Sequence, residues 1–115
     1  MFYEGLIHVY GLKNCDTCRK ARRALEDAGY NHEFVDFRLS PIDKSVIQDW
    51  LFALGEEILI NRKSTTWRNL DDNEKLLDPI HLLGTHPTLI KRPVIVHKGG
   101  IHVGWSSDVR QVLGC

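Results

Sequence analysis

The hydrophobic and polar positions of the first forty residues follow two different periods. Residues 6–10 form a short, β-prone run closed by Gly11, and residues 32–37 repeat this type of run. Between them, residues 16–28 carry apolar side chains at helical spacing, and Gly29 is a typical helix stop. A strand, a helix and a strand in this order predict a β-α-β unit whose two strands are parallel.

The middle of the chain is predominantly helical in pattern. Ser40 and Pro41 predict a helix that begins at Pro41, because proline suits the first helical position, and that ends at Gly55. The following stretch, residues 58–90, is less regular, and its apolar positions and prolines predict short helices at 66–70, 72–76 and 79–86.

The C-terminal part returns to strand patterns. Residues 93–97 and 101–104 predict a hairpin around the turn 98–100, and Ser106 or Ser107 caps a final helix. The complete order is β-α-β, then helices, then β-β-α. This is the order of a thioredoxin-like α/β fold with a mixed sheet. We therefore expect one domain over residues 1–115, with a helical insertion at about 41–90.

Length and charge narrow the function classes. The chain has 115 residues, enough for one core, and its 15 basic and 15 acidic residues give a formal net charge of zero. Neither nucleic acid nor a membrane is expected as a partner, because there is no overall positive charge, no signal-peptide pattern and no apolar run of membrane-spanning length. We expect a cytoplasmic monomer, in which three cysteines do not form a disulfide framework.

Two of the three cysteines lie in the segment KNCDTCRK, between the first predicted strand and helix. Cys15 falls at the mouth of the helix, where unpaired N–H groups and the helix dipole favour a thiolate. Cys18 lies one turn later, close enough to resolve a mixed disulfide formed on Cys15, but also on the apolar stripe of the helix. Cys15 is therefore the predicted reactive thiol, and Cys18 is either its resolving partner or a packed side chain.

Other side chains suggest further chemistry. Arg62 and Arg92 lie beside turn and strand patterns, where a guanidinium group either binds an anion or is simply solvated. Trp105 either borders the site or covers the sheet. A zinc site built from Cys15, Cys18 and the pair His81 and His86 is disfavoured by the long separation of the two halves, so no metal or other bound cofactor is expected.

Three segments together resemble the arsenate reductase-like (ArsC/Spx) family, and most of all its short YffB-like branch. They are IHVYGLKNCDTCRKARRALEDAGYNHEFVDFR, LINRKSTTWRNL and HPTLIKRPVIV, in this order. The resemblance implies a thioredoxin-like fold with Cys15 as the reactive thiol and Arg62 and Arg92 as two oxyanion-binding arginines. It also implies a cis Arg92–Pro93 bond that faces the cysteine.

Two departures from the arsenate reductases alter the expected activity. Trp105 stands where those enzymes carry a third arginine, and Cys18 stands where they carry a serine-like residue, so that the pair resembles the redox-sensing Spx regulators instead. YffB-like proteins are regarded as glutathione-dependent thiol reductases. The resemblance therefore implies a glutathione-dependent thiol–disulfide oxidoreductase, with Cys15, Cys18, Arg62 and Arg92 in catalysis and Asn14, Pro93 and Trp105 in substrate binding.

Two other functions remain open at this stage. One is arsenate reduction itself, which a site with two arginines would support less well than a site with three. The other is a regulator that binds RNA polymerase, as Spx proteins do, in which Cys15 and Cys18 act only as a redox switch. A small thiol, disulfide or oxyanion is the expected substrate, and glutathione is the expected co-substrate.

Overall fold

The structure is a computed structural model that describes residues 5–115, and it divides into two compact units. The first unit contains the chain up to Phe37 together with Arg92–Cys115, and the second contains Arg38–Lys91. The second unit covers the segment in which the sequence predicts a helical insertion, while the assignment of a single domain stays a prediction. None of the helices in the described part of the chain is long and apolar enough to cross a membrane.

The first unit is built on a four-stranded mixed sheet in the order β2-β1-β3-β4. Strand β1 (Ile7–Gly11) pairs in parallel with β2 (His32–Asp36), which confirms the predicted β-α-β unit around α1 (Asp16–Asp27). Strand β3 (Val94–His97) is antiparallel to β1 and to β4 (Gly100–Val103). The predicted hairpin is therefore present.

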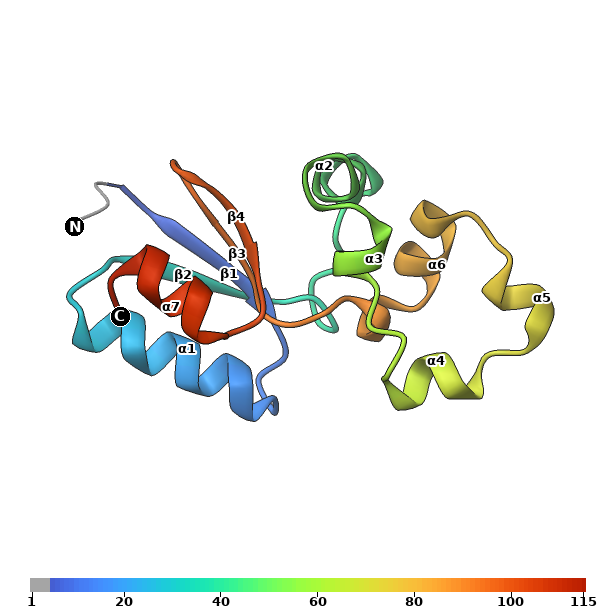
Figure 1. Cartoon of the computed structure of the whole chain (residues 1–115), viewed down its shortest axis with the longest axis horizontal. Coiled ribbons are helices and arrows are strands. Elements are labelled where there is room, and N and C mark those ends of the chain that lie inside the picture. The colour runs from blue at the N-terminus through green and yellow to red at the C-terminus, as the bar shows by residue number, and fades with distance from the viewer. Residues whose placement is uncertain (1–4) are drawn as a thin grey trace. The chain divides into compact units, whose positions relative to one another are not determined.

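One face of this sheet is covered by helices α1 and α7 (Ser107–Leu113), as Figure 1 shows. The core between these layers consists of buried side chains from the two central strands, both helices and the turn after α1: Ile7, Val9, Leu25, Tyr30, Ile95 and Leu113. The Tyr30 hydroxyl donates a hydrogen bond of 2.8 Å to the Leu113 carbonyl oxygen and so ties α7 to the turn after α1. Ser106 caps α7, as one of the two sequence alternatives predicts.

The second unit is helical and differs from the sequence prediction at two points. Helix α2 (Lys44–Leu54) begins three residues after Pro41, with Asp43 in the N-cap position, although the Asp43 side chain makes no capping hydrogen bond. Gly55 has a φ of 84° and ends α2 as predicted, but the chain then enters a short helix that was not predicted, α3 (Glu56–Leu59). The remaining elements are α4 (Thr65–Asn69), α5 (Asp72–Lys75), α6 (Pro79–Thr85) and a 3-10 turn, η1 (Pro87–Leu89).

A histidine pair joins the two strands of the hairpin. His97 Nε2 and His102 Nε2 are 2.8 Å apart, and the Gly99 N–H donates to His97 Nδ1 at 2.9 Å. Since His97 Nδ1 accepts this bond, we assign the proton of neutral His97 to Nε2, which donates to His102. The arrangement accommodates two neutral rings and has no place for an additional proton on His97.

This pair should make the stability of the protein depend on pH. Burial, and the neighbouring His102, lower the pKa of His97, and burial lowers the pKa of His102. The unfolded chain therefore binds protons more readily. The stability that this pair contributes is complete above pH 6.5 and is lost as the pH falls through the lowered folded pKa values. Thermal unfolding from pH 7.5 to 5.5 should show a smaller pH dependence in the His97→Gln/His102→Gln variant. An equal dependence in both proteins would contradict this assignment.

Candidate active site

Cys15 is the N-cap of α1 and follows the loop that leaves β1. Its backbone is extended, its carbonyl oxygen accepts the first helical hydrogen bond from the Arg19 N–H at 3.0 Å, and its side chain is half-buried. The thiol makes no capping hydrogen bond with standard geometry. It nevertheless lies at the positive end of the helix dipole, where a negative sulfur is favoured.

The surroundings of Cys15 stabilise its thiolate. Burial alone would raise the pKa of Cys15, but the Cys18 N–H, the Cys18 thiol and the Arg92 guanidinium act in the opposite direction and lower it overall. Cys18 therefore acts as a donor to the sulfur of Cys15, and Arg92 supplies both a hydrogen bond and a positive charge. The predicted reactive thiol thus has an environment of the kind that activates a cysteine.

Cys18 has the opposite character. It is completely buried, and burial together with the neighbouring Cys15 raises its pKa to about 12, although the Leu12 N–H and Arg92 favour its thiolate. Its sulfur lies against β1, so closely that a Cβ atom on Gly11 would be only 2.4 Å from Cys18 Sγ. At neutral pH, Cys18 is therefore a neutral donor with little access to a substrate.

Two substitutions at Cys18 distinguish its role as a hydrogen-bond donor to the Cys15 sulfur from a role in forming a disulfide. Cys18→Ala removes the thiol donor but keeps the N–H donor. It should slow alkylation of Cys15 at pH 7 about tenfold, since a hydrogen bond to a charged group is worth about 1.5–3 kcal/mol. Cys18→Ser keeps a donor in the same place and should retain most of the rate. The measurement is the alkylation rate as a function of pH, and equal rates in the two variants would contradict the donor role.

The loop before Cys15 is held by a carboxylate that sequence reasoning did not identify. The Lys13 N–H donates to Asp36 Oδ2 at 3.0 Å. The predicted parallel pairing of the two strands could have indicated this bond, because Asp36 stands opposite Gly11, which is two residues before Lys13. Asp36 at the end of β2 thus orients the backbone that leads to Cys15.

Loss of this carboxylate should affect the loop more than the fold. Asp36→Ala should lower the free energy of unfolding by about 1 kcal/mol and accelerate amide hydrogen exchange in residues 12–15, whereas Asp36→Asn keeps an acceptor oxygen and should have a smaller effect. Exchange measured by NMR checks this result. Unchanged exchange in Asp36→Ala would show that the bond does not order the loop.

Arg92 and Pro93 precede β3 and belong to the same unit as Cys15. The Arg92–Pro93 peptide bond is cis, as the family resemblance implies. The Pro93 carbonyl oxygen accepts a hydrogen bond of 2.9 Å from the Gly104 N–H, which links the start of β3 to the end of the hairpin. The structure thus brings Arg92 to Cys15, while direct contact of Pro93 with a substrate stays a prediction.

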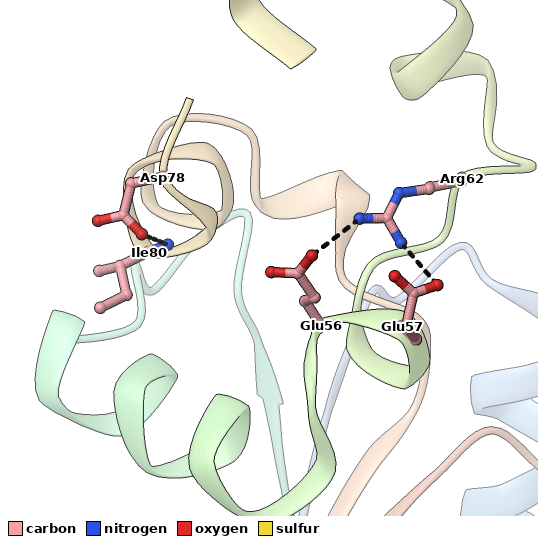
Figure 2. Close-up of polar contacts among 5 residues, drawn as sticks. All are labelled: Glu56, Glu57, Arg62, Asp78 and Ile80. Atoms are coloured by element: carbon pink, nitrogen blue, oxygen red, sulfur yellow. Dashed lines mark hydrogen bonds and ion pairs between the residues drawn. The ribbon is translucent and has the colours of Figure 1, made fainter. Parts of the chain in front are cut away.

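Arg62 lies in the second unit and has acidic partners there (Figure 2). Its guanidinium nitrogens are 3.6 Å from Glu56 and 3.4 Å from Glu57, and its Cζ atom lies 5.3 Å from the centre of the Trp67 ring. Figure 2 also shows Asp78, which accepts the Ile80 N–H at 3.3 Å at the start of α6. The charge of Arg62 is therefore partly neutralised by two neighbouring carboxylates that the sequence pattern does not indicate.

The remaining predicted substrate-binding residues have different surroundings. Asn14 is exposed in the loop before Cys15. Trp105 is half-buried and packs against the core of the first unit, as in the alternative in which it covers the sheet. In residues 5–115, no group of three or more His, Cys, Asp or Glu side chains is placed to hold a metal ion.

In the first unit, Cys15 lies at the start of the first helix and beside Arg92, which precedes a cis-proline. This arrangement defines a thioredoxin-like protein in which the pKa of the helix-terminal cysteine is lowered. Within this class, residues 10–112 match the ArsC family, and the chain belongs to that family. It is 40% identical over 110 residues to an uncharacterised protein of Haemophilus influenzae, covering 92% of this chain and 96% of the relative. It is also 30% identical over 118 residues to the global transcriptional regulator Spx of Bacillus subtilis, covering 94% and 87%.

Solved structures agree with this assignment. A YFFB protein has 34% identity and a TM-score of 0.86, covering 93% of this chain and 97% of the other. An arsenate reductase from Vibrio cholerae (19% identity, TM-score 0.77, 95% and 96% coverage) and a glutaredoxin from Archaeoglobus fulgidus (16%, 0.52, 93% and 83%) show the shared fold. At this level the chain has the fold of thiol-based reductases.

Proposed function

We propose that this protein is a glutathione-dependent thiol–disulfide oxidoreductase of the cytoplasm, with Cys15 as its nucleophile. The observation that carries the proposal is the environment of Cys15, in which a helix N-terminus, the Cys18 donors and Arg92 favour the thiolate. A thiolate, rather than a thiol, is the species that attacks a disulfide.

The reaction proceeds in two exchanges. The Cys15 thiolate attacks the glutathione sulfur of a protein–glutathione disulfide, the S–S bond breaks, and the protein cysteine leaves as a thiolate that takes up a proton. A second glutathione thiolate then attacks the Cys15–glutathione disulfide, releases oxidised glutathione and restores the Cys15 thiolate. Two glutathione sulfurs are joined in the product, and the protein cysteine gains the electron pair.

Glutathione is a better candidate than Cys18 for the second exchange. Cys18 is completely buried and its pKa is raised to about 12, so little of it is ionised at neutral pH. A thiol resolves a mixed disulfide quickly only when it is accessible and partly ionised. In this proposal Cys18 is a positioning residue that donates to Cys15.

The number of arginines available to bind an oxyanion favours a thiol substrate over arsenate. Arg92 is directed to Cys15, Arg62 is paired with Glu56 and Glu57, and an aromatic residue, Trp105, stands in place of a third arginine. A multiply charged oxyanion needs several charge-assisted hydrogen bonds at once. The carboxylates of glutathione each carry a single charge and require fewer of them.

The test combines ionisation and turnover. Alkylation of Cys15 with iodoacetamide should have its midpoint at a lower pH than for an ordinary cysteine. The protein should reduce the mixed disulfide of glutathione and 2-mercaptoethanol with glutathione as reductant, and should reduce arsenate slowly or not at all. Ordinary alkylation without turnover of either substrate would refute the enzymatic proposal, and fast arsenate turnover would replace it with the alternative.

A redox-dependent regulator is the second candidate, because the 30% identical relative carries the name of a transcriptional regulator. The Cys15 and Cys18 sulfurs already interact, so that oxidation joining them would form the switch. Pull-down of purified RNA polymerase by the reduced and oxidised protein tests this candidate. Oxidation-dependent capture would support it, and no capture in either state would exclude it.

A further inference from the structure

After Asp16, the charges of α1 are arranged against the helix dipole. Residues 13–23 contain five cations and one anion, whereas the last turn of the helix contains Glu26 and Asp27 and no cation. A helix is stabilised by the reverse order, with acidic residues first and basic residues last. Cations placed only to solubilise the chain would serve equally well at the other end, so their position beside Cys15 needs another explanation.

Four of these cations form what we call the basic face of α1: Arg19, Lys20, Arg22 and Arg23. The opposite side of the helix carries the buried residues Cys18, Ala21 and Leu25. At about 100° per residue, the four cations spread over about 160° of the helix circumference. The basic face therefore occupies most of the exposed surface of the helix that begins at the reactive thiol.

The surface beside these side chains is open and shallow. One hollow of about 200 Å³ lies between α1 and the edge strand β2, among Arg19, Arg22, Arg23, Glu26 and His32. Another of about 200 Å³ adjoins Arg19, Lys20 and Arg23. Both are below the size of about 300 Å³ at which pockets enclose a small ligand. An extended surface of opposite charge fits this shape better than an enclosed molecule.

The side chains around the basic face of α1 favour a protein over a nucleic acid as its binding partner. Single-stranded nucleic acids stack their bases on exposed aromatic rings. At this face the Phe34 ring is covered by the Arg22 guanidinium, whose carbon lies 4.2 Å from the ring centre. Glu26 beside the hollow would also repel a continuous phosphate backbone. Carboxylates on a folded protein can be spaced to avoid it.

We propose that the basic face of α1 is a docking surface for an acidic protein substrate, whose disulfide it guides to Cys15. This inference rests on the proposed function and specifies the substrate as a protein with acidic residues around its reactive cysteine. Complementary charge steers association and raises its rate at low ionic strength. Because the first residue of the same helix is adjacent to Cys15, docking along α1 also places the partner at the thiol.

The experiment uses the full chain and two model peptides. Each peptide carries a central cysteine joined to glutathione, flanked in one case by aspartates and in the other by lysines. The test variant is Lys20→Glu/Arg23→Glu, because these two cations have no ion pair in the described residues, whereas Arg19 pairs with Asp16. The control is Lys44→Glu/Lys98→Glu, an equal change of charge at exposed residues of other elements. Circular dichroism verifies that both variants are folded.

Turnover and binding are measured separately. For the native protein, kcat/KM should be about tenfold higher for the acidic than for the basic peptide at about 0.02 M salt, and this ratio should approach one at about 0.3 M. The ratio should also approach one in the test variant and persist in the control. Fluorescence anisotropy with serine-containing versions of the peptides, which cannot react, should give the same order of binding.

The outcomes distinguish the two proposals. Equal turnover of the acidic and basic peptides, or an equal loss of preference in the control variant, would overturn docking while the reductase function stands. Preferential binding of the acidic peptide without turnover of any mixed disulfide would refute the reductase function while docking stands. Tighter binding of a single-stranded oligonucleotide than of the acidic peptide would also overturn the docking proposal.

Discussion

Replacing Cys15 with serine is expected to lower the turnover of a glutathione mixed disulfide by at least about a thousandfold. A serine hydroxyl is not ionised at neutral pH, and neither the helix dipole nor Arg92 can make it an adequate nucleophile towards a disulfide. No other thiol can replace it, since Cys18 is buried and burial raises the pKa of Cys115. The measurement is steady-state turnover with glutathione as reductant.

The matched control for this prediction is Cys115→Ser. It makes the same chemical change at a half-buried thiol that packs beside the core of the first unit, with its sulfur 3.8 Å from the Ala24 carbonyl oxygen. This variant should retain native turnover. Substantial activity in Cys15→Ser, or its loss in Cys115→Ser, would show that the reactive thiol has been wrongly assigned.

Replacing Gly11 with alanine is expected to destabilise the protein by about 1–3 kcal/mol, as other overpacked cores are. The added Cβ would lie 2.4 Å from Cys18 Sγ, and neither β1 nor the buried turn of α1 can easily move away. Chemical denaturation gives the free energy of unfolding. A shift in position of α1 would also disturb the Cys15 thiolate, so alkylation should slow in parallel.

A second substitution tests the cause of this destabilisation. Cys18→Ala removes the colliding sulfur, and the nearest remaining Cys18 atom, Cβ, would lie 3.5 Å from the added carbon, an ordinary contact. The Gly11→Ala/Cys18→Ala double variant should therefore be more stable than Gly11→Ala alone. Additive losses in this cycle would indicate that the effect of Gly11→Ala does not arise from the sulfur.

The predictions that succeeded relied on local, periodic signals. The apolar spacing within 16–28 and Gly29 placed α1, and the short runs on either side placed two parallel strands. Pro41 misled because proline suits the first helical position without requiring a helix there, and Asp43, two residues later, is of a type that also favours the N-cap. The short helix α3 was missed because Gly55 has two roles in the structure: it ends α2 and is also the N-cap of α3, and only the first was predicted.

The unpredicted parts of the site depend on contacts between distant residues. The bond from Lys13 to Asp36 requires the register of β1 against β2, and the contact of Gly11 with Cys18 requires the exact approach of α1 to the sheet. The ion pairs of Arg62 with Glu56 and Glu57 depend on where α3 begins. Sequence could therefore place Cys15 at the start of its helix, but could not identify the neighbours that set the environment of its thiol.

The three cysteines occupy environments that change their pKa values in different directions, and this has a practical use. The pKa of Cys15 is lowered, that of Cys115 is raised and that of Cys18 is raised to about 12. A maleimide dye applied briefly in mildly acidic buffer should therefore label one position of the native sequence. Single-molecule and fluorescence-quenching experiments could then observe how partners approach Cys15, and the other two cysteines would not have to be removed first.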